Sequence, residues 1–396
     1  MIKLYKGEFM LSPAPVEIDL NYCSHKCVYC FANLNNPKRK ANLKQIINVL
    51  NSKENNPIAY FINNGYPVLF SNLVDPFASS NYKMSIPLIE IMEEKGISIA
   101  YQTKGGKGSE ILNEVSKSSV YVTITSDNGQ SEMHEPNAPK ILDRIKFIET
   151  LIKNGHSVTV GVNPYIPEWF NDVKSFIKLM KSIGVYGLWF QPLHLNRDQV
   201  SAMNQKEKTS FDSHVKNGLS RKYFFEISSK IDAEIMAMCK DVGIHFFSNT
   251  KTTESKFFDN FKKVYKNSLP TYQDFFNHLL KTKKNNERVY FNEFEKLIIS
   301  KLPNISHSSF QGYLFNDGFM IKKFKKIPKV ISLKDVLKLY WQEENCFKFI
   351  GDNDMLSFLA TETDIKYKKV LDDNNMSIYL FNNNGFENYY ITEKEV

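Results

Sequence analysis

Residues 19–32 read DLNYCSHKCVYCFA and bring three cysteines, Cys23, Cys27 and Cys30, onto one short segment. The other two cysteines of the 396-residue chain, Cys239 and Cys346, are isolated in the sequence. In a reducing compartment, thiols grouped in this way are typical of a metal site or a catalytic group rather than of disulfides. The segment therefore predicts where the chemistry of this protein takes place.

The C-x3-C-x2-C spacing places three thiolates close enough together to bind three irons of a cubane cluster. A structural zinc site needs four protein ligands, whereas three thiolates leave one iron of a [4Fe-4S] cluster open to an exogenous ligand. We therefore predict a [4Fe-4S] cluster held by Cys23, Cys27 and Cys30. The alternative is a zinc site that His25, Cys239 or Cys346 would complete.

Before residue 200, short runs of β-branched and aromatic residues alternate with amphipathic stretches at helical spacing. This alternation is typical of βα units around a parallel sheet. We therefore predict an α/β fold, a partial (β/α)6 barrel over residues 1–200. The predicted strands are Pro15–Leu20, Pro67–Ser71, Ile97–Thr103, Ser119–Thr125, Ser157–Asn163 and Gly187–Gln191, and the predicted helices are Leu43–Ser52, Met84–Glu94, Ser109–Lys117, Pro139–Asn154 and Trp169–Ile183.

Polar residues recur where each predicted strand ends. In barrels of parallel strands the active site lies at the carboxyl ends of the strands. The cysteine segment follows the first strand, so we expect these polar side chains to share one mouth with it. In strand order they are Asp75, Lys104, Ser126, Asn163 and Gln191, with His194 just beyond the last strand.

The net charge of +8 is concentrated in one block of the chain. Residues 251–330 carry 16 basic and 7 acidic groups, whereas residues 331–396 carry 7 basic and 12 acidic groups. This asymmetry favours a polyanionic partner, DNA or RNA, at the middle block, although a lysine-rich solvated face would look the same.

The first ten residues lack the apolar stretch of a signal peptide, and no stretch approaches the roughly 20 apolar residues that span a membrane. We expect a cytoplasmic protein.

Three further regions follow the barrel. Residues 201–250 predict a polar loop or lid at Ser201–Lys222, then a helix over 223–242 and a strand, which together close the barrel. Residues 251–330 predict three short helices and a basic two-stranded wing, as in a winged-helix fold; the third helix, with Ser306 as N-cap, would enter a groove of the nucleic acid. Residues 331–396 predict an acidic α/β tail region. The predicted nucleic-acid-binding residues are the wing lysines Lys322, Lys323, Lys325 and Lys326.

The cysteine spacing, with an aromatic residue before the last cysteine, resembles the motif of the radical S-adenosylmethionine (SAM) superfamily. Residues 15–170 resemble its branch of spore photoproduct lyases and DNA repair photolyases. The matching pieces are DLNYCSHKCVYCFA at 19–32, VDP at 74–76, QTK at 102–104, TITS at 123–126, EPNAPKILDR at 135–144 and VNPYIP at 162–167.

The resemblance implies a SAM cofactor on the open iron. It implies that Asp75, Lys104 and Ser126 bind the polar end of SAM, Arg144 its carboxylate region and the backbone around Tyr29 its adenine. Asn163, at the same mouth, completes the predicted set of cofactor-binding residues. The implied reaction is reductive cleavage of SAM to a 5′-deoxyadenosyl radical that abstracts hydrogen from substrate, with an electron donor of the flavodoxin or ferredoxin type.

One feature departs from the family. Spore photoproduct lyases carry a barrel cysteine that returns a hydrogen atom to the product radical, yet this chain has no cysteine between Cys30 and Cys239. We therefore expect a lyase or modifying enzyme, similar to spore photoproduct lyase, that repairs or modifies a nucleic acid or nucleotide. Thymine-dimer repair itself would need Cys239 or a tyrosine in place of the missing cysteine. The alternatives are a radical SAM enzyme acting on a peptide or small metabolite, and a non-catalytic iron-sulfur protein that binds nucleic acid.

Overall fold

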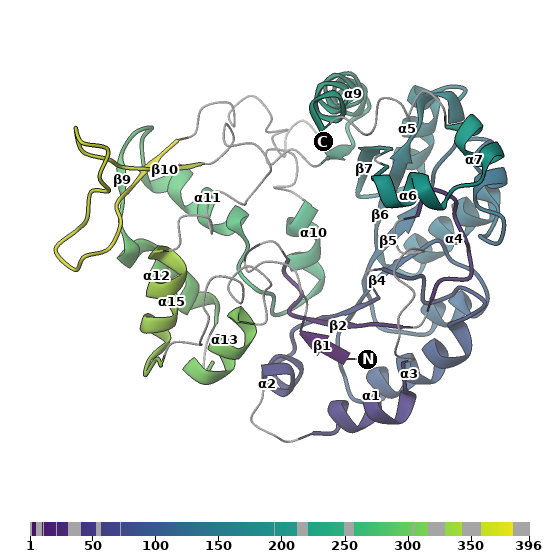
Figure 1. The fold of residues 1–396 in the computed structure, drawn as a ribbon. Coiled ribbons are helices and arrows are strands. Elements are labelled where there is room, and N and C mark those ends of the chain that lie inside the picture. The colour runs from purple at the N-terminus through teal and green to yellow at the C-terminus, as the bar shows by residue number, and fades with distance from the viewer. Residues whose placement is uncertain are drawn as a thin grey trace.

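The computed structural model describes residues 2–4, 10, 12–20, 22–30, 41–52, 57–71, 73–193, 195–211, 221–248, 257–302, 305–315, 329–342 and 358–382. Its largest element is an eight-stranded sheet in which each strand pairs with its neighbours in sequence. The first pair is antiparallel and all later pairs are parallel, which makes the sheet a partial α/β barrel (Figure 1). In order, the strands are β1 (Ile2–Leu4), β2 (Val16–Ile18), β3 (Val68–Phe70), β4 (Ile99–Thr103), β5 (Ser119–Thr123), β6 (Ser157–Tyr165), β7 (Gly187–Pro192) and β8 (His245–Phe247).

The six strands predicted for the barrel are confirmed as β2 to β7, and the strand expected after the helix over 223–242 is β8. Helices cover one face of the sheet, where alternate residues such as Val120, Val122 and Val160 are fully buried against Ile148 and Met92. Strand β1 was not predicted. The covering helices are α1 (Leu43–Leu50), α3 (Tyr82–Glu94), α4 (Ile141–Lys153), α5 (Val173–Ile183) and α9 (Arg221–Val242).

Four of the predicted helices are shorter than expected, and two of them differ by more than three residues. The segment predicted as Ser109–Lys117 forms only a 3-10 helix, η2 (Ser109–Asn113). The helix predicted from Trp169 begins instead at Val173, because the Asp172 side chain accepts a hydrogen bond from the Ser175 backbone N–H at 3.0 Å and caps the first turn.

A short helix at Gln205–Ser210 lies within the stretch predicted as a loop or lid, Ser201–Lys222, and another at Arg197–Ala202 ends at its second residue, so the loop prediction was wrong at these positions. Helices α6 (Arg197–Ala202) and α7 (Gln205–Ser210) are too short to show apolar periodicity. Each begins with a capping box, formed by Asn196 with Gln199 and by Asn204 with Glu207. Helix α9 ends at Gly243 with φ +75°, as its sequence predicts.

Helix α10 (Phe257–Val264) lies on the opposite, concave face of the barrel (Figure 1). Phe261 and Tyr265 pack there against Ala14 and Ala100. The Tyr265 hydroxyl donates to the Ile99 carbonyl at 2.6 Å and accepts from the Ser119 N–H at 2.8 Å. Helix α10 therefore packs on the barrel strands, and its Lys262 also forms an ion pair with Asp274 at 2.6 Å.

The remaining elements form a helical bundle with a small antiparallel sheet, packed beside the barrel (Figure 1). Trp341 is fully buried at its centre, 5.4 Å from the ring of Phe294 and 4.8 Å from that of Tyr379. The sheet order is β10-β11-β9. The elements are α11 (Tyr272–Thr282), β9 (Arg288–Val289), α12 (Phe291–Lys301), α13 (His307–Leu314), α15 (Leu333–Gln342), β10 (Leu359–Thr361) and β11 (Tyr379–Phe381).

Helix α13 is the one predicted to start at Ser306, and the Ser306 side chain caps it by accepting from the Ser309 N–H at 3.1 Å. It packs against helix α2 (Pro57–Asn63) of the barrel, where Tyr313 lies 5.3 Å from Phe61. The predicted wing lysines, Lys322, Lys323, Lys325 and Lys326, lie outside the described residues. None of the helices in the described part of the chain is both long and apolar enough to cross a membrane.

Candidate active site

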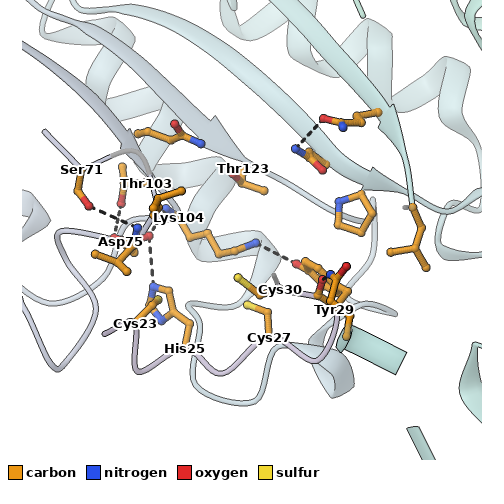
Figure 2. Close-up of a pocket in the computed structure, with 18 of the residues that line it drawn as sticks. Cys23, His25, Cys27, Tyr29, Cys30, Ser71, Asp75, Thr103, Lys104 and Thr123 are labelled. Carbon is orange, nitrogen blue, oxygen red and sulfur yellow. Dashed lines mark hydrogen bonds and ion pairs between the residues drawn. The ribbon is translucent and has the colours of Figure 1, made fainter. Parts of the chain in front are cut away.

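One cavity of about 510 Å³ opens at the carboxyl ends of the barrel strands and contains the predicted cluster cysteines (Figure 2). Cys23, Cys27 and Cys30 line it from the loop after β2. Each of the next strands contributes further lining residues where it ends, which is where barrels of this kind hold their active sites. These residues are Ser71, Leu73, Val74 and Asp75 after β3, Gln102, Thr103 and Lys104 at β4, Thr123 at β5, Asn163 and Pro164 at β6, and Gln191, Pro192 and Leu193 at β7.

The cysteine loop is fastened to the segment 134–137, which lies outside the cavity. The Val28 N–H donates to the His134 carbonyl at 3.0 Å, and the Asn137 N–H donates to the His25 carbonyl at 3.3 Å. The Asn137 side chain donates to the Ser24 carbonyl at 3.0 Å. A loop tied along its backbone presents its thiols in a fixed arrangement, as a cluster ligand set requires.

Asp75 connects the cysteine loop to the end of β4. Its Oδ1 accepts from the Thr103 hydroxyl and from the Phe77 N–H, both at 2.8 Å, and its Oδ2 accepts from the Lys104 N–H at 2.5 Å. His25 Nε2 lies 3.2 Å from the same Oδ2. Burial alone would raise the pKa of Asp75, but His25 and the two backbone donors together lower it.

Glu135 is the centre of a second buried network. Its carboxylate accepts from the Lys104 ammonium at 2.7 Å and from the Thr125 hydroxyl at 3.0 Å. It also accepts from the Tyr29 hydroxyl and from the Arg144 guanidinium. Burial would raise the pKa of Glu135, but the positive charges of Lys104 and Arg144 outweigh burial and hold that pKa well below its usual range. Two cations share one carboxylate, so this network carries an excess of positive charge.

The environment of the three thiols suits binding to a cluster. Burial is the main cause that raises the pKa of Cys23 to about 11 and of Cys27 to about 12. Thiolates in such a site need a compensating cation, which iron would supply. Within the described residues no three His, Cys, Asp or Glu side chains converge tightly enough to bind a single ion. A cubane cluster does not require its thiolates to converge on one point, because each thiolate binds a different iron.

The geometry disfavours the zinc alternative. His25 is buried with Nδ1 3.0 Å from the Asn137 carbonyl and Nε2 beside Asp75, so both ring nitrogens face other groups than the thiols. Cys239 is fully buried on α9, where it belongs to the apolar core. Burial strongly raises the pKa of this thiol. Cys346 lies outside the described residues.

The structure brings most, but not all, of the predicted cofactor-binding residues to the cavity. Tyr29, Asp75, Lys104 and Asn163 line it. Ser126 is fully buried behind the wall, where its hydroxyl contacts that of Ser131 at 2.9 Å. Arg144 is also fully buried.

The Arg144 guanidinium donates to the carbonyls of Pro139 and Thr123 and to Glu135, so it contacts the cavity wall from behind, at Thr123, and the lining residue Lys104 through Glu135. His194, another residue expected near the mouth, lies outside the described residues.

Glu135 and Gln199 were not predicted as site residues. Glu135 stands at the start of the segment EPNAPKILDR, but an isolated carboxylate in a sequence does not indicate two cationic partners. Gln199 lines the cavity from α6 and donates to the Tyr29 carbonyl at 2.7 Å. Its capping-box pattern, Asn196-x-x-Gln199, is the only local signal of its placement.

No family model matches the sequence, and no curated protein matches it. The chain is similar to the solved structure of spore photoproduct lyase complexed with a dinucleoside spore photoproduct, with 14% identity over 53% of this chain and 64% of that chain and a TM-score of 0.38. It is also similar to SuiB of Streptococcus suis bound to precursor peptide SuiA, with 14% identity over 63% of this chain and 53% of that chain and a TM-score of 0.42. The similarity to SuiB bound to S-adenosylmethionine has 14% identity over 53% of this chain and 49% of that chain and a TM-score of 0.35. The chain covers less than two thirds of each of these structures.

Proposed function

We propose that this chain is a radical SAM enzyme that acts on a nucleic acid or nucleotide. The observation that carries the proposal is that three thiols from one loop line the same cavity as Lys104, at the carboxyl ends of parallel strands. When bound by Cys23, Cys27 and Cys30, a reduced [4Fe-4S] cluster would supply the electron that cleaves SAM to methionine and a 5′-deoxyadenosyl radical.

The residues of the chain have three tasks in this proposal. The Lys104 ammonium pairs with the carboxylate of SAM. Glu135 holds that lysine ammonium in place from the side away from the cavity. Arg144 keeps Glu135 ionised and so acts on the site indirectly. Asp75 keeps His25 and the cysteine loop in register with β4, because its carboxylate contacts His25 on one side and the Thr103 hydroxyl and Lys104 N–H on the other.

The walls of the cavity would position the substrate and exclude water. Asn163 and Gln191 face each other across neighbouring strands, with the Asn163 side-chain amide donating to Gln191 Oε1 at 3.1 Å. Such amides donate and accept hydrogen bonds, which suits the edges of a nucleobase as well as a peptide. The choice of a nucleic acid therefore rests on the rest of the molecule, namely the block 251–330 with its 16 basic and 7 acidic groups.

The C-terminal elements support the same choice. The order α11, β9, α12, α13, α15, β10, β11, with the sheet order β10-β11-β9, follows the pattern of a winged helix with one additional helix. In this proposal the wing is the ribbon of β10 and β11, whereas Lys322, Lys323, Lys325 and Lys326 remain predicted contacts outside the described residues.

Anaerobic reconstitution with iron and sulfide, followed by dithionite and SAM, tests the proposed chemistry. We expect visible absorption of a cluster and formation of 5′-deoxyadenosine by the unchanged chain. Cys27→Ala should abolish both, while the matched control Cys239→Ala, a cysteine outside the cavity, should retain both. An intact cluster with no 5′-deoxyadenosine would overturn the enzyme proposal and favour a non-catalytic iron-sulfur protein.

The substrate class needs a separate measurement. SAM carrying deuterium at its 5′ carbon would be incubated with the reduced enzyme and with DNA, RNA or protein fractions from cells that lack the gene. We expect a mass change or deuterium exchange in a nucleoside released from one of the nucleic-acid fractions. A change confined to a peptide or a small metabolite would replace the nucleic-acid assignment and leave the radical chemistry in place.

A further inference from the structure

The β10–β11 ribbon ends in two tight hairpins. Beyond the paired strands, Thr363 bridges Lys369 and Leu371 bridges Ser377, so the chain turns back twice between the two strands. Figure 1 shows this ribbon, in yellow, extending from the helical bundle on the side away from the barrel. We call residues 363–369 the tip hairpin and residues 371–377 the second hairpin.

The tip hairpin has a defined conformation. The Asp364 carboxylate accepts from the backbone N–H groups of Lys366 and Lys368, both at 2.8 Å. The Asp364 N–H donates to the Lys368 carbonyl at 2.7 Å, and the Tyr367 N–H donates to the Asp364 carbonyl at 2.9 Å. These bonds fix the turn, so the side chains at its end are presented without a large further cost in conformational entropy.

The side chains at the end of the tip hairpin are apolar and almost wholly in solvent. Ile365 is 100% exposed and Tyr367 is 89% exposed. Lys366 and Lys368 lie beside them and are also exposed. Large apolar side chains gathered on a projecting loop indicate a contact surface rather than a contribution to folding.

The charges around the tip favour a polyanion. The carboxylate of Asp364 is engaged by backbone donors, and that of Glu362, at the base, is paired with Arg288 at 2.8 and 2.6 Å. Asp364 keeps its charge, but Lys366, Lys368 and Lys369 outnumber it, so the tip hairpin has a net charge of +2 and its lysines are exposed. The second hairpin differs, because Asp372 and Asp373 stand at its turn.

We propose that the tip hairpin binds the minor groove of a nucleic-acid duplex. Proteins that bind this groove commonly insert an apolar wedge between lysine or arginine contacts to the phosphates, and the groove of B-DNA is about 6 Å wide. Ile365 and Tyr367 are the wedge, and Lys366 and Lys368 contact the two strands. The inference rests on the proposed function in that it names a duplex as the partner of the proposed enzyme.

The position of helix α13 strengthens the case for the ribbon. This helix was predicted to enter a groove, but its Tyr313 packs on Phe61, and a Cβ placed at Gly312 would lie 2.9 Å from Pro57 Cγ. One face of α13 is therefore covered by α2 of the barrel. The ribbon projects freely at the edge of the described part of the bundle, and Figure 1 shows no barrel element beside it.

Fluorescence anisotropy with a labelled mixed-sequence DNA duplex of about two helical turns tests the proposal on the full chain. We expect the pair Lys366→Gln and Lys368→Gln to weaken binding roughly tenfold and to reduce the slope of log K against log salt by about 2. The pair Ile365→Ser and Tyr367→Asn should weaken binding with that slope unchanged, because no phosphate contact is lost. Asn accepts the left-handed backbone, φ +57°, at position 367.

The matched control removes two exposed lysines from the outer helices of the barrel, by Lys153→Gln and Lys178→Gln. If the control and the lysine variants of the tip lose equal duplex affinity, net charge alone explains the effect and the proposal is overturned. Binding of the unchanged chain to vesicles of anionic lipid but not to duplex would also overturn it, in favour of a membrane contact. Because 5′-deoxyadenosine formation is measured separately, tip variants that lose duplex binding but still cleave SAM distinguish this proposal from the proposed function.

Discussion

Two buried carboxylates show how the environment of a single residue sets its chemistry. Glu135 lies between Lys104 and Arg144, and these cations keep it ionised in a fully buried position. Asp232, on α9, is also buried, but its described surroundings provide only the Ser248 hydroxyl, at 2.9 Å. Burial therefore raises the pKa of Asp232 to about 6, and the serine only partly offsets it.

The difference predicts a pH-dependent stability. An unfolded Asp has a pKa near 3.9, so the folded state binds more protons between about pH 4 and 6, and stability falls as the pH rises through that range. Asp232→Asn should remove this loss and stabilise the chain by roughly 1–2 kcal/mol at pH 7.5, with little change at pH 4. Denaturant unfolding of both chains at the two pH values checks the prediction. An Asn variant that is less stable at pH 7.5 would mean that Asp232 has an ionic partner in the folded chain.

At the scale of elements, the register of β5 against β6 depends on one small residue. Gly161 of β6 pairs with Thr123 of β5, and the Tyr121 side chain reaches across to it, so that a Cβ added at Gly161 would lie 1.9 Å from the Tyr121 hydroxyl oxygen. Nearby, Phe257 of α10 packs on the Tyr121 ring, with ring centroids 6.4 Å apart. The tyrosine therefore has little room to move aside.

We expect Gly161→Ala to destabilise the chain by about 3 kcal/mol, because the overpacked tyrosine must shift or distort the strand. In a Tyr121→Ala background the same substitution should cost almost nothing, since the clashing ring is absent. Unfolding free energies of the two single variants and the double variant form a double-mutant cycle that measures this coupling. Additive losses would show that Gly161 is required for a backbone reason instead.

The sequence predicted the barrel strands well because short runs of β-branched or aromatic residues, such as Ser119–Thr123, alternate with stretches at helical spacing. It did not predict helices α6 and α7, since six residues are too few for an apolar period and only their capping boxes mark them. The site residues also divide into those that a local sequence pattern indicates and those that it does not. The cysteines and Lys104 carry a local signal, whereas the roles of Glu135 and Arg144 depend on contacts that form only when distant segments meet.

At the scale of the whole molecule, the barrel and the following residues form one folding unit. Phe261 and Tyr265 occupy the concave face of the sheet, and the Leu269 N–H donates to the Pro13 carbonyl at 2.8 Å. The apolar residues of the C-terminal bundle belong to the same continuous core as those of the barrel. The cavity at the strand ends is therefore supported from the opposite end of the barrel by residues that follow position 250.

This arrangement predicts that a chain ending at residue 256 will not fold into a stable barrel, although it keeps the cysteines and every residue that lines the cavity. Removing α10 exposes Leu69 and Ala100 to water and deprives the Ile99 carbonyl and the Ser119 N–H of the Tyr265 hydroxyl. Each buried polar group left without a partner costs about 1–3 kcal/mol, which is a large part of the stability of a typical domain. Thermal unfolding followed by circular dichroism should show a cooperative transition for the full chain and none for the shortened one. A chain of residues 1–256 that unfolds cooperatively and still assembles a cluster would show that the barrel is independent of α10, and that its concave face can be closed by the barrel residues alone.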